Sequence, residues 1–263
     1  MMEGNIQLEI RQGAFRYHDG PVIFEDVSFS LRAGQVFCIL GPNGAGKSTL
    51  LNCLANLFPL QKGEILLNGQ PMHTLSRREV AQWIGYVPQS QDPTYGYTVR
   101  DFVVMGRAPY ISTMQLPKQE DFEKADQALE IMGIEHLRDR PYTDISGGER
   151  QQATIARVIA QEPKIILMDE PTSSLDFGNQ LRTIRMIRAL AQRGYAVVMT
   201  THNPDHAIML DDTVGVLDRE GRMTAGRARQ VLTEQLLSSV YRVDVKIVHV
   251  DAVDRDACLT KME

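Results

Sequence analysis

The chain has 263 residues, of which 43% are hydrophobic, and its 28 lysines and arginines against 33 aspartates and glutamates give a formal net charge of -5. This composition is typical of a globular protein long enough to bury a core, and it disfavours disordered, collagen-like and coiled-coil chains. Because the balance is acidic and no block of basic residues stands out, we expect no nucleic-acid partner.

The cysteines Cys38, Cys53 and Cys258 show no C-x-x-C spacing, which argues against a disulfide framework or a zinc knuckle and fits a reducing cytoplasm. No apolar run approaches the roughly 20 residues that a membrane helix needs. Residues 1–11 lack the layout of a signal peptide. If the protein works at a membrane, another chain has to span it.

The N-terminal part of the chain predicts short strands. Ile6, Leu8 and Ile10 alternate with polar residues, and residues 22–31 form a second apolar stretch after a turn-like segment. The apolar run 36–40 predicts a third strand. These patterns indicate a β-rich opening.

Helical spacing appears first between Leu50 and Phe58, after a Gly-rich loop. Further along, Asn68-Gly69 predicts a tight turn, and residues 76–79 have the form of a helix-opening capping box. From about residue 92 to 142 the pattern becomes helical, which predicts an inserted helical lobe.

The second half of the chain alternates strand-like and helical stretches, which argues for an α/β fold with a mostly parallel sheet covered by helices on both faces. A final apolar stretch near residues 243–250 predicts a late strand or hairpin. The predicted strands are residues 164–168, 196–200 and 214–217, and the predicted helices are residues 151–160 and 181–191.

A phosphate-binding loop is predicted between the strand 36–40 and the helix that follows, where the sequence matches G-x-x-x-x-G-K-[ST]. Its glycines let backbone N–H groups face phosphate oxygens, Lys47 would reach the β- and γ-phosphates of ATP, and Ser48 would ligate Mg²⁺. An ordinary Gly-rich turn would not require Lys followed by Ser. The residues expected to contact ATP here are Gly41, Pro42, Asn43, Gly44, Ala45, Gly46, Lys47, Ser48 and Thr49.

A pair of carboxylates, Asp169 and Glu170, follows the apolar run 165–168. The carboxyl ends of strands in open α/β sheets are where ligands bind. We therefore expect Asp169 to orient Mg²⁺ and Glu170 to act as general base toward the attacking water. The alternative is that both are ordinary polar residues at a strand end.

Residues 145–151, Ile-Ser-Gly-Gly-Glu-Arg-Gln, resemble the L-S-G-G-Q signature of the ATP-binding-cassette family. The other family motifs follow in order, so the resemblance covers essentially the whole chain. It implies a P-loop NTPase (RecA-like) fold with an N-terminal antiparallel β subdomain and an inserted α-helical subdomain. It also implies that residues 1–263 form a single nucleotide-binding domain with three parts. The catalytic core with the β subdomain covers about 1–91 and 143–230, the helical subdomain covers about 92–142, and a tail of one helix and one strand covers 231–263.

The resemblance also assigns roles to single residues. Tyr17 resembles the aromatic residue that stacks on adenine, and Gln89 the Q-loop glutamine that contacts Mg²⁺ and water. Asp176 lies in a segment similar to the D-loop, and His202 is similar to the switch histidine that contacts the γ-phosphate. Together with Lys47 and Glu170, Gln89 and His202 are the expected catalytic residues.

The signature segment implies a second copy of the chain. Ser146, Gly147, Gly148 and Glu149 would cover the γ-phosphate of the ATP held by the partner copy, so that two copies enclose two ATP molecules. Glu149 replaces the usual Gln and adds negative charge near the nucleotide, unless it caps the following helix.

Two histidines four residues apart, His202 and His206, could also bind zinc, but no third ligand is apparent. We favour His206 as an ordinary helix residue. Trp83 and the methionines at positions 105, 114 and 132 are most simply core or subunit-contact residues.

Residues 98–110, 146–157 and 243–250 resemble the ATPases of importers for iron-siderophore, haem, corrinoid or molybdate substrates. This implies two integral-membrane permease subunits, a periplasmic or extracellular substrate-binding protein, and a peripheral location on the cytoplasmic face of a bacterial or archaeal plasma membrane. A docking surface for the permease is expected, with core packing as the alternative for each residue, at Tyr95, Tyr97, Val99, Phe102, Val103, Val104 and Met105.

A soluble single-cassette ATPase that switches a protein or nucleic-acid complex is the alternative function. A small-molecule P-loop kinase ranks third, because a kinase would not need the signature segment. Copurification with a permease separates the importer from the soluble switch.

Overall fold

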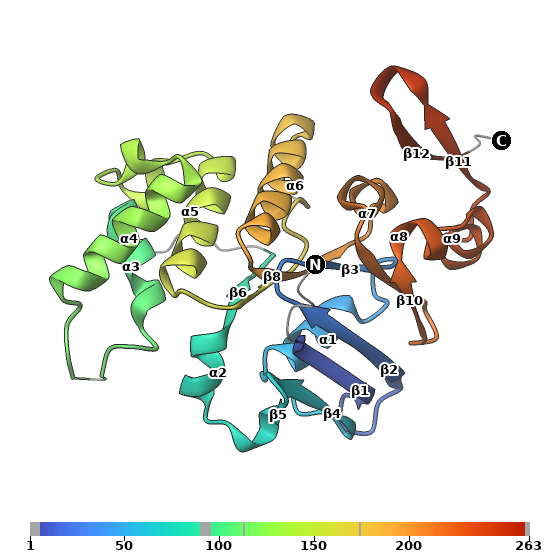
Figure 1. The fold of residues 1–263 in the computed structure, drawn as a ribbon, viewed down its shortest axis with the longest axis horizontal. Helices are drawn as coiled ribbons and strands as arrows, with labels where there is room; N and C mark the ends of the chain where they lie inside the picture. Colours follow the sequence, from blue (N-terminus) through green and yellow to red (C-terminus); the bar gives the residue numbers. More distant parts are fainter. Residues whose placement is uncertain (1–5, 90–95, 113, 174, 261–263) are drawn as a thin grey trace.

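The computed structural model describes residues 6–89, 96–112, 114–173 and 175–260. Its largest sheet has six strands: β3 (Val36–Leu40), β6 (Ile84–Val87), β7 (Ile165–Met168), β8 (Ala196–Thr201), β9 (Thr213–Leu217) and β10 (Met223–Arg227). They lie in the order β10-β9-β3-β8-β7-β6, parallel except for β10, which pairs antiparallel with β9 (Figure 1). The predicted α/β class with a mainly parallel sheet is confirmed.

Strand β3 shows how this sheet separates two hydrophobic cores. Val36, Cys38 and Leu40 lie in one core, and Phe37 and Ile39 lie in the other. Successive side chains of a strand point to opposite faces, so both faces of the sheet are covered. This double burial explains why the sequence shows continuous apolar runs here.

A second, antiparallel sheet is formed by β1 (Ile6–Arg16), β2 (Val22–Arg32), β4 (Lys62–Leu67) and β5 (Gln70–Pro71), in the order β2-β1-β4-β5. The β4–β5 turn is the predicted one, with Asn68 at φ 49° and Gly69 at φ 80°. Positive φ at both central positions is what a tight hairpin turn needs. The predicted antiparallel β subdomain is therefore present.

Helix α1 (Lys47–Leu54) lies between the two sheets, because its Leu50 and Leu51 share a core with residues of both. The prediction that this helix continues to Phe58 is wrong. Asn56 has φ 58°, a left-handed conformation that does not continue an α-helix. Beyond it, Leu57 is 61% exposed, and the Phe58 ring stacks on that of Phe15.

Most described residues between β6 and β7 are helical, as expected. Helix α4 (Gln119–Met132) buries Ala125, Leu129 and Met132 on one side, and it ends at Gly133, whose φ is 67°. Left-handed glycines commonly end helices in this way. The helical elements here are α3 (Val99–Val104), η2 (Met105–Arg107), α4 (Gln119–Met132), η3 (Glu135–Leu137), η4 (Tyr142–Asp144) and α5 (Gly147–Ala160).

The remaining elements include the predicted C-terminal hairpin, β11 (Val245–Val250) with β12 (Arg255–Thr260), which projects away from the six-stranded sheet (Figure 1). Helix α2 (Arg77–Trp83) opens with the predicted capping box between Ser76 and Glu79. The other helical elements are η1 (Met72–Thr74), α2 (Arg77–Trp83), α6 (Phe177–Gln192), α7 (Pro204–Leu210), α8 (Ala228–Val231), α9 (Glu234–Tyr241) and η5 (Asp251–Val253).

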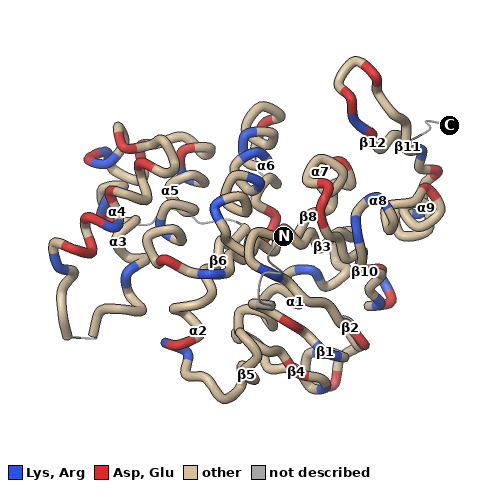
Figure 2. The backbone as a smooth tube through the Cα atoms, in the orientation of Figure 1, with Lys and Arg blue, Asp and Glu red and all other residues tan. Residues whose placement is uncertain are grey.

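Charged side chains of both signs are interspersed along the described chain (Figure 2). None of the helices in the described ranges is long and apolar enough to cross a membrane.

Candidate functional site

The predicted phosphate loop connects β3 to α1 and has the backbone conformation that its glycines allow. Gly44 has φ 80° and Gly46 has φ 94°, and both values lie in the left-handed region that disfavours other residues. Gly46 is the residue before the first turn of α1, so the N-terminal N–H groups of that helix lie at the end of the loop. This arrangement presents backbone donors suited to an anion.

Lys47 is enclosed by this loop and is only 5% exposed. Its Nζ donates hydrogen bonds to the backbone oxygens of Gly41, at 2.9 Å, and Pro42, at 3.1 Å. It also lies 3.2 Å from Oε1 of Glu170. A buried ammonium group needs such partners, and it is positioned for a multiply charged phosphate ligand.

Asp169 and Ser48, both expected at the Mg²⁺ site, are in direct contact: the Ser48 hydroxyl donates to Asp169 Oδ1 at 2.9 Å. Two residues that the motif analysis did not single out hold the same carboxylate. Thr200 donates to Oδ1 at 2.7 Å, and the Tyr86 hydroxyl lies 3.5 Å from Oδ2 and 3.1 Å from Asn52 Oδ1. Asp169 is 6% exposed, so these donors fix its orientation.

Glu170 lies between the predicted lysine and the predicted histidine. Its Oε2 is 3.1 Å from Nδ1 of His202, and its other carboxylate oxygen pairs with Lys47. The backbone of Glu170 has φ 42°, and its N–H donates to Thr200 Oγ1 at 2.8 Å. A non-glycine residue in this conformation is held by its surroundings and is common at functional sites.

Thr200 therefore connects Asp169 and Glu170, because its hydroxyl accepts from the backbone N–H of Glu170 and donates to the side chain of Asp169. It occupies a fully buried position near the C-terminal end of β8. A polar residue at the carboxyl end of a buried strand is the signal that would have identified it.

Tyr17 and Gln89 lie at the edge of this cluster. Tyr17 is 44% exposed, its ring packs edge-on against that of Phe15, and its hydroxyl lies 3.1 Å from Thr49 Oγ1. Gln89 Nε2 lies 3.5 Å from Ser173 Oγ, a long contact that holds it weakly. An exposed aromatic face beside the phosphate loop suits stacking on a base.

The signature segment opens helix α5 with a capping box. Ser146 Oγ accepts from the Glu149 N–H, and Glu149 Oε2 accepts from the Ser146 N–H at 2.7 Å. Hydrogen bonds from Ser146 hold the pKa of the Glu149 carboxyl below its usual value. The Glu149 side chain therefore caps the helix, which is one of the two environments considered for it above.

The D-loop segment lies beside this helix end. Asp176 caps α6 by accepting from the backbone N–H and the side-chain amide of Asn179, both at 2.8 Å. A Cβ added at Gly148 would meet the same amide at 3.2 Å. Asn179 therefore connects the signature and D-loop segments, and no motif indicated it. Ser174, also in the D-loop segment, lies outside the described residues.

His206 is buried, with Nδ1 3.2 Å from Thr201 Oγ1 and 3.4 Å from Thr172 Oγ1, and Nε2 3.4 Å from Asn203. Burial lowers the pKa of its imidazole. His206 thus has a structural environment distinct from that of His202, whose side chain is 49% exposed.

The expected docking surface divides in two. Tyr97 is 49% exposed and Met105 is 42% exposed, whereas Tyr95 lies outside the described residues. The remaining residues form part of a hydrophobic core, so the docking role expected for them is wrong and the core alternative holds: they are Val99, Phe102, Val103 and Val104. The apolar side of α3 packs on α4 and α5, so these side chains are buried within the protein.

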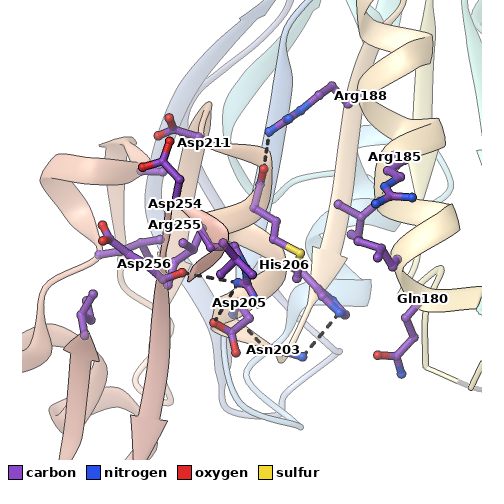
Figure 3. Close-up of a pocket in the computed structure, with 18 of the residues that line it drawn as sticks. Gln180, Arg185, Arg188, Asn203, Asp205, His206, Asp211, Asp254, Arg255 and Asp256 are labelled. Carbon is purple, nitrogen blue, oxygen red and sulfur yellow. Dashed lines mark hydrogen bonds and ion pairs between the residues drawn. The ribbon is translucent and has the colours of Figure 1, made fainter. Parts of the chain in front are cut away.

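A groove of about 960 Å³ lies away from these residues, between α6 on one side and the β11–β12 hairpin on the other (Figure 3). Polar and charged side chains line much of it, including Arg185, Asp205 and Asp256. None of the predicted nucleotide-binding residues belongs to its described lining. The phosphate loop, and not this groove, is the candidate active site.

Comparison with known proteins shows the family to which the chain belongs. The family model described as ABC transporter matches residues 24–173. An uncharacterised ABC transporter ATP-binding protein from Haemophilus influenzae is 40% identical over 92% of each chain. A molybdate import ATP-binding protein from the same organism is 36% identical over 91% of this chain and 89% of that protein.

A solved structure of a metal-chelate type ABC transporter in an inward-facing conformation is also similar. It has a TM-score of 0.87 and 32% sequence identity, with 98% of each chain covered. The predicted family, ATPase activity and importer relationship are confirmed. The chain belongs to the ABC transporter family and is the ATP-hydrolysing subunit of an ABC transporter.

Proposed function

We propose that this chain hydrolyses ATP with Glu170 as general base, His202 next to the γ-phosphate, and Lys47 holding the phosphates. The observation that carries the proposal is the contact of Glu170 with both other residues, at 3.2 Å from Lys47 Nζ and 3.1 Å from His202 Nδ1. A base must lie within reach of the proton it accepts and close to the groups that stabilise the developing charge.

Ser48, Asp169 and Gln89 are the proposed Mg²⁺ ligands. The hydroxyl and carboxylate oxygens of Ser48 and Asp169 already lie together, and oxygen is the ligand that Mg²⁺ prefers. No cluster of three or more His, Cys, Asp or Glu in the described chain could hold a metal by itself. This fits an ion bound through one carboxylate together with substrate phosphates, whose charge it would neutralise.

The complete site is proposed to need two copies of the chain. Ser146 and Gly147 are exposed at the start of α5, a helix of 14 residues. The capping box uses the N–H groups of Ser146 and Glu149, so the N–H groups of Gly147 and Gly148 at the same helix end are the ones that suit the phosphate of a nucleotide on a second copy. Asp176 is proposed to lie at the same boundary, beside Asn179.

The membrane partners are proposed to be two permease subunits, at the cytoplasmic face of a bacterial or archaeal plasma membrane. The segment 97–116 exposes large apolar side chains, which are typical of a protein interface. Met114 is 99% exposed and Leu116 is 85% exposed. We propose as the docking surface only the exposed apolar side chains of this segment, which are Tyr97, Met105, Tyr110, Met114 and Leu116. We also propose that residues about 92–142 form the helical subdomain.

The proposed cargo is a metal-chelate-type substrate, such as an iron-siderophore, haem, a corrinoid or molybdate, delivered by a substrate-binding protein. The proposal rests on the molybdate import relative and on the metal-chelate type transporter described above. The permease and binding protein are expected to select among these substrates.

The experiment is a detergent pull-down from native membranes, followed by reconstitution in vesicles with ATP and candidate chelates. We expect a multi-span permease to be recovered and ATP-dependent uptake to follow. Replacing Met114 and Leu116 with Ser should reduce recovery, whereas Val253→Ser, at a hairpin residue that is 58% exposed, should not. Recovery of soluble partners alone would favour the single-cassette switch instead.

A further inference from the structure

The orientation of His202 depends on its backbone. The side chain is 49% exposed, so packing contributes little to holding the ring in place. The residue follows β8 and precedes Asn203, which caps α7 and whose N–H donates to Thr201 Oγ1 at 3.1 Å. Contacts to this short connection therefore determine where the imidazole can lie relative to Glu170.

One such contact comes from the C-terminal part of the chain. The Tyr241 hydroxyl, at the end of α9, donates to the backbone oxygen of His202 at 2.9 Å. Burial raises the pKa of this hydroxyl, so it remains a donor throughout the neutral range. Nothing in the motif analysis indicated this residue, because the contact spans 39 positions of sequence.

Helix α9 is itself firmly placed. Its Leu237 is fully buried and its Val240 is 6% exposed, and Glu234 Oε1 accepts from the Ile247 N–H of β11 at 3.0 Å. Arg242, at φ 59°, ends the helix directly after Tyr241. The phenol ring is thus attached to a packed helix with little freedom to move.

A second contact joins the first turn of α7, directly after this connection, to the hairpin. Asp205 Oδ1 accepts from the backbone N–H of Cys258 at 2.9 Å, and the side chain of Asp205 points toward the hairpin in Figure 3. The stretch from His202 to Asp205 therefore lies between the catalytic sheet and the C-terminal segment.

We propose that Tyr241 is a positioning residue that holds the backbone of His202 so that its imidazole stays against Glu170. The inference rests on the proposed role of His202 in hydrolysis. Tyr241 contacts the backbone oxygen of His202 and no residue of the phosphate loop in the described contacts. Its loss should therefore slow hydrolysis without weakening the binding of ATP. Loss of the hydroxyl should lower kcat while the KM for ATP stays the same.

The test compares Tyr241→Phe with Tyr195→Phe in the full chain with Mg-ATP. Tyr195 is a matched control, because it is also a partly buried tyrosine whose pKa is raised by burial, and it packs at the other end of β8. For Tyr241→Phe we expect kcat to fall by about fivefold, the change that one lost neutral hydrogen bond produces. The control should keep its kcat, and both variants should keep KM.

A double variant separates a positioning role from a general loss of stability. If Tyr241 acts through His202, Tyr241→Phe should cause no further loss in a His202→Ala background. An equal fivefold loss in both backgrounds would overturn the proposal. Normal turnover of His202→Ala would overturn the role of His202 and the inference together, whereas slow His202→Ala with normal Tyr241→Phe would overturn the inference alone.

A spectroscopic measurement gives a result that is independent of turnover. The ring ¹H–¹³C signal of His202, assigned from its loss in His202→Ala, should shift or broaden in Tyr241→Phe and stay unchanged in Tyr195→Phe. An identical His202 signal in Tyr241→Phe and the unaltered chain would contradict the proposal.

Discussion

The substitution Glu170→Gln tests the chemistry of the site with almost no change in shape. The carboxylate is 12% exposed and contacts Lys47 Nζ at 3.2 Å and His202 Nδ1 at 3.1 Å. An amide of the same size removes the negative charge and the base, but the two carbonyl oxygens that accept from Lys47 remain. We therefore expect ATP binding to persist.

The expected loss in kcat is about 10²- to 10⁴-fold, the range that general bases contribute. Without nucleotide, the free energy of unfolding should fall by about 1–3 kcal/mol, because buried Lys47 loses its charged partner. The assay is phosphate release at saturating ATP, with size-exclusion chromatography in Mg-ATP to detect a trapped dimer of two closed copies.

The matched control is Glu220→Gln, which makes the same change at a carboxylate that is 58% exposed and pairs with the surface residue Arg222. It should hydrolyse ATP at the normal rate. Normal turnover by Glu170→Gln would refute the assignment of Glu170 as the base. Loss of ATP binding would refute the claim that Lys47 and the phosphate loop hold the phosphates without the Glu170 carboxylate.

Three further predictions concern neighbouring groups. Thr200→Val removes the buried hydroxyl that joins Glu170 to Asp169, and we expect urea unfolding to show a loss of about 1–3 kcal/mol, together with slower hydrolysis; unchanged stability and turnover would argue against that link. Ser146→Ala should cost about 1 kcal/mol of unfolding free energy through the lost cap of α5, and an unchanged urea midpoint would contradict it. Burial lowers the pKa of His206 in the folded state, so its contribution to stability is present above the unfolded pKa of about 6.5 and is lost as the pH falls below that value. Urea unfolding at pH 7.5 and pH 5 should show a fall in the free energy of unfolding that is smaller in His206→Gln. An equal fall in both proteins would contradict the burial argument.

Much of the fold was predictable because apolar periodicity and turn chemistry agreed with each other. The strand that ends in the phosphate loop and the Asn68-Gly69 turn were both located correctly. The end of α1 was not, because an apolar pattern continued past Asn56 although the backbone there becomes left-handed. In α3 the same kind of pattern described a core, since apolar side chains at helical spacing suit burial as well as docking.

The site was predictable where motifs carry chemistry in a few adjacent residues. Lys47, Ser48, Asp169 and Glu170 were placed together because a strand end and a glycine loop bring them to one edge of the sheet. The residues that hold this cluster were not predicted. Thr200 acts through one hydroxyl in a buried strand, and such long-range hydrogen bonds leave no local pattern.

The most direct test of the account is a calorimetric titration of Mg-ATP into the unaltered chain, Lys47→Ala and Lys62→Ala. Lys47 is buried in the phosphate loop, whereas Lys62 is an exposed lysine at the start of β4. The account predicts saturable binding by the unaltered chain and Lys62→Ala, and affinity weakened by at least about 100-fold in Lys47→Ala, since charge-assisted bonds to phosphate are the strong ones. Equal affinity in all three would contradict it.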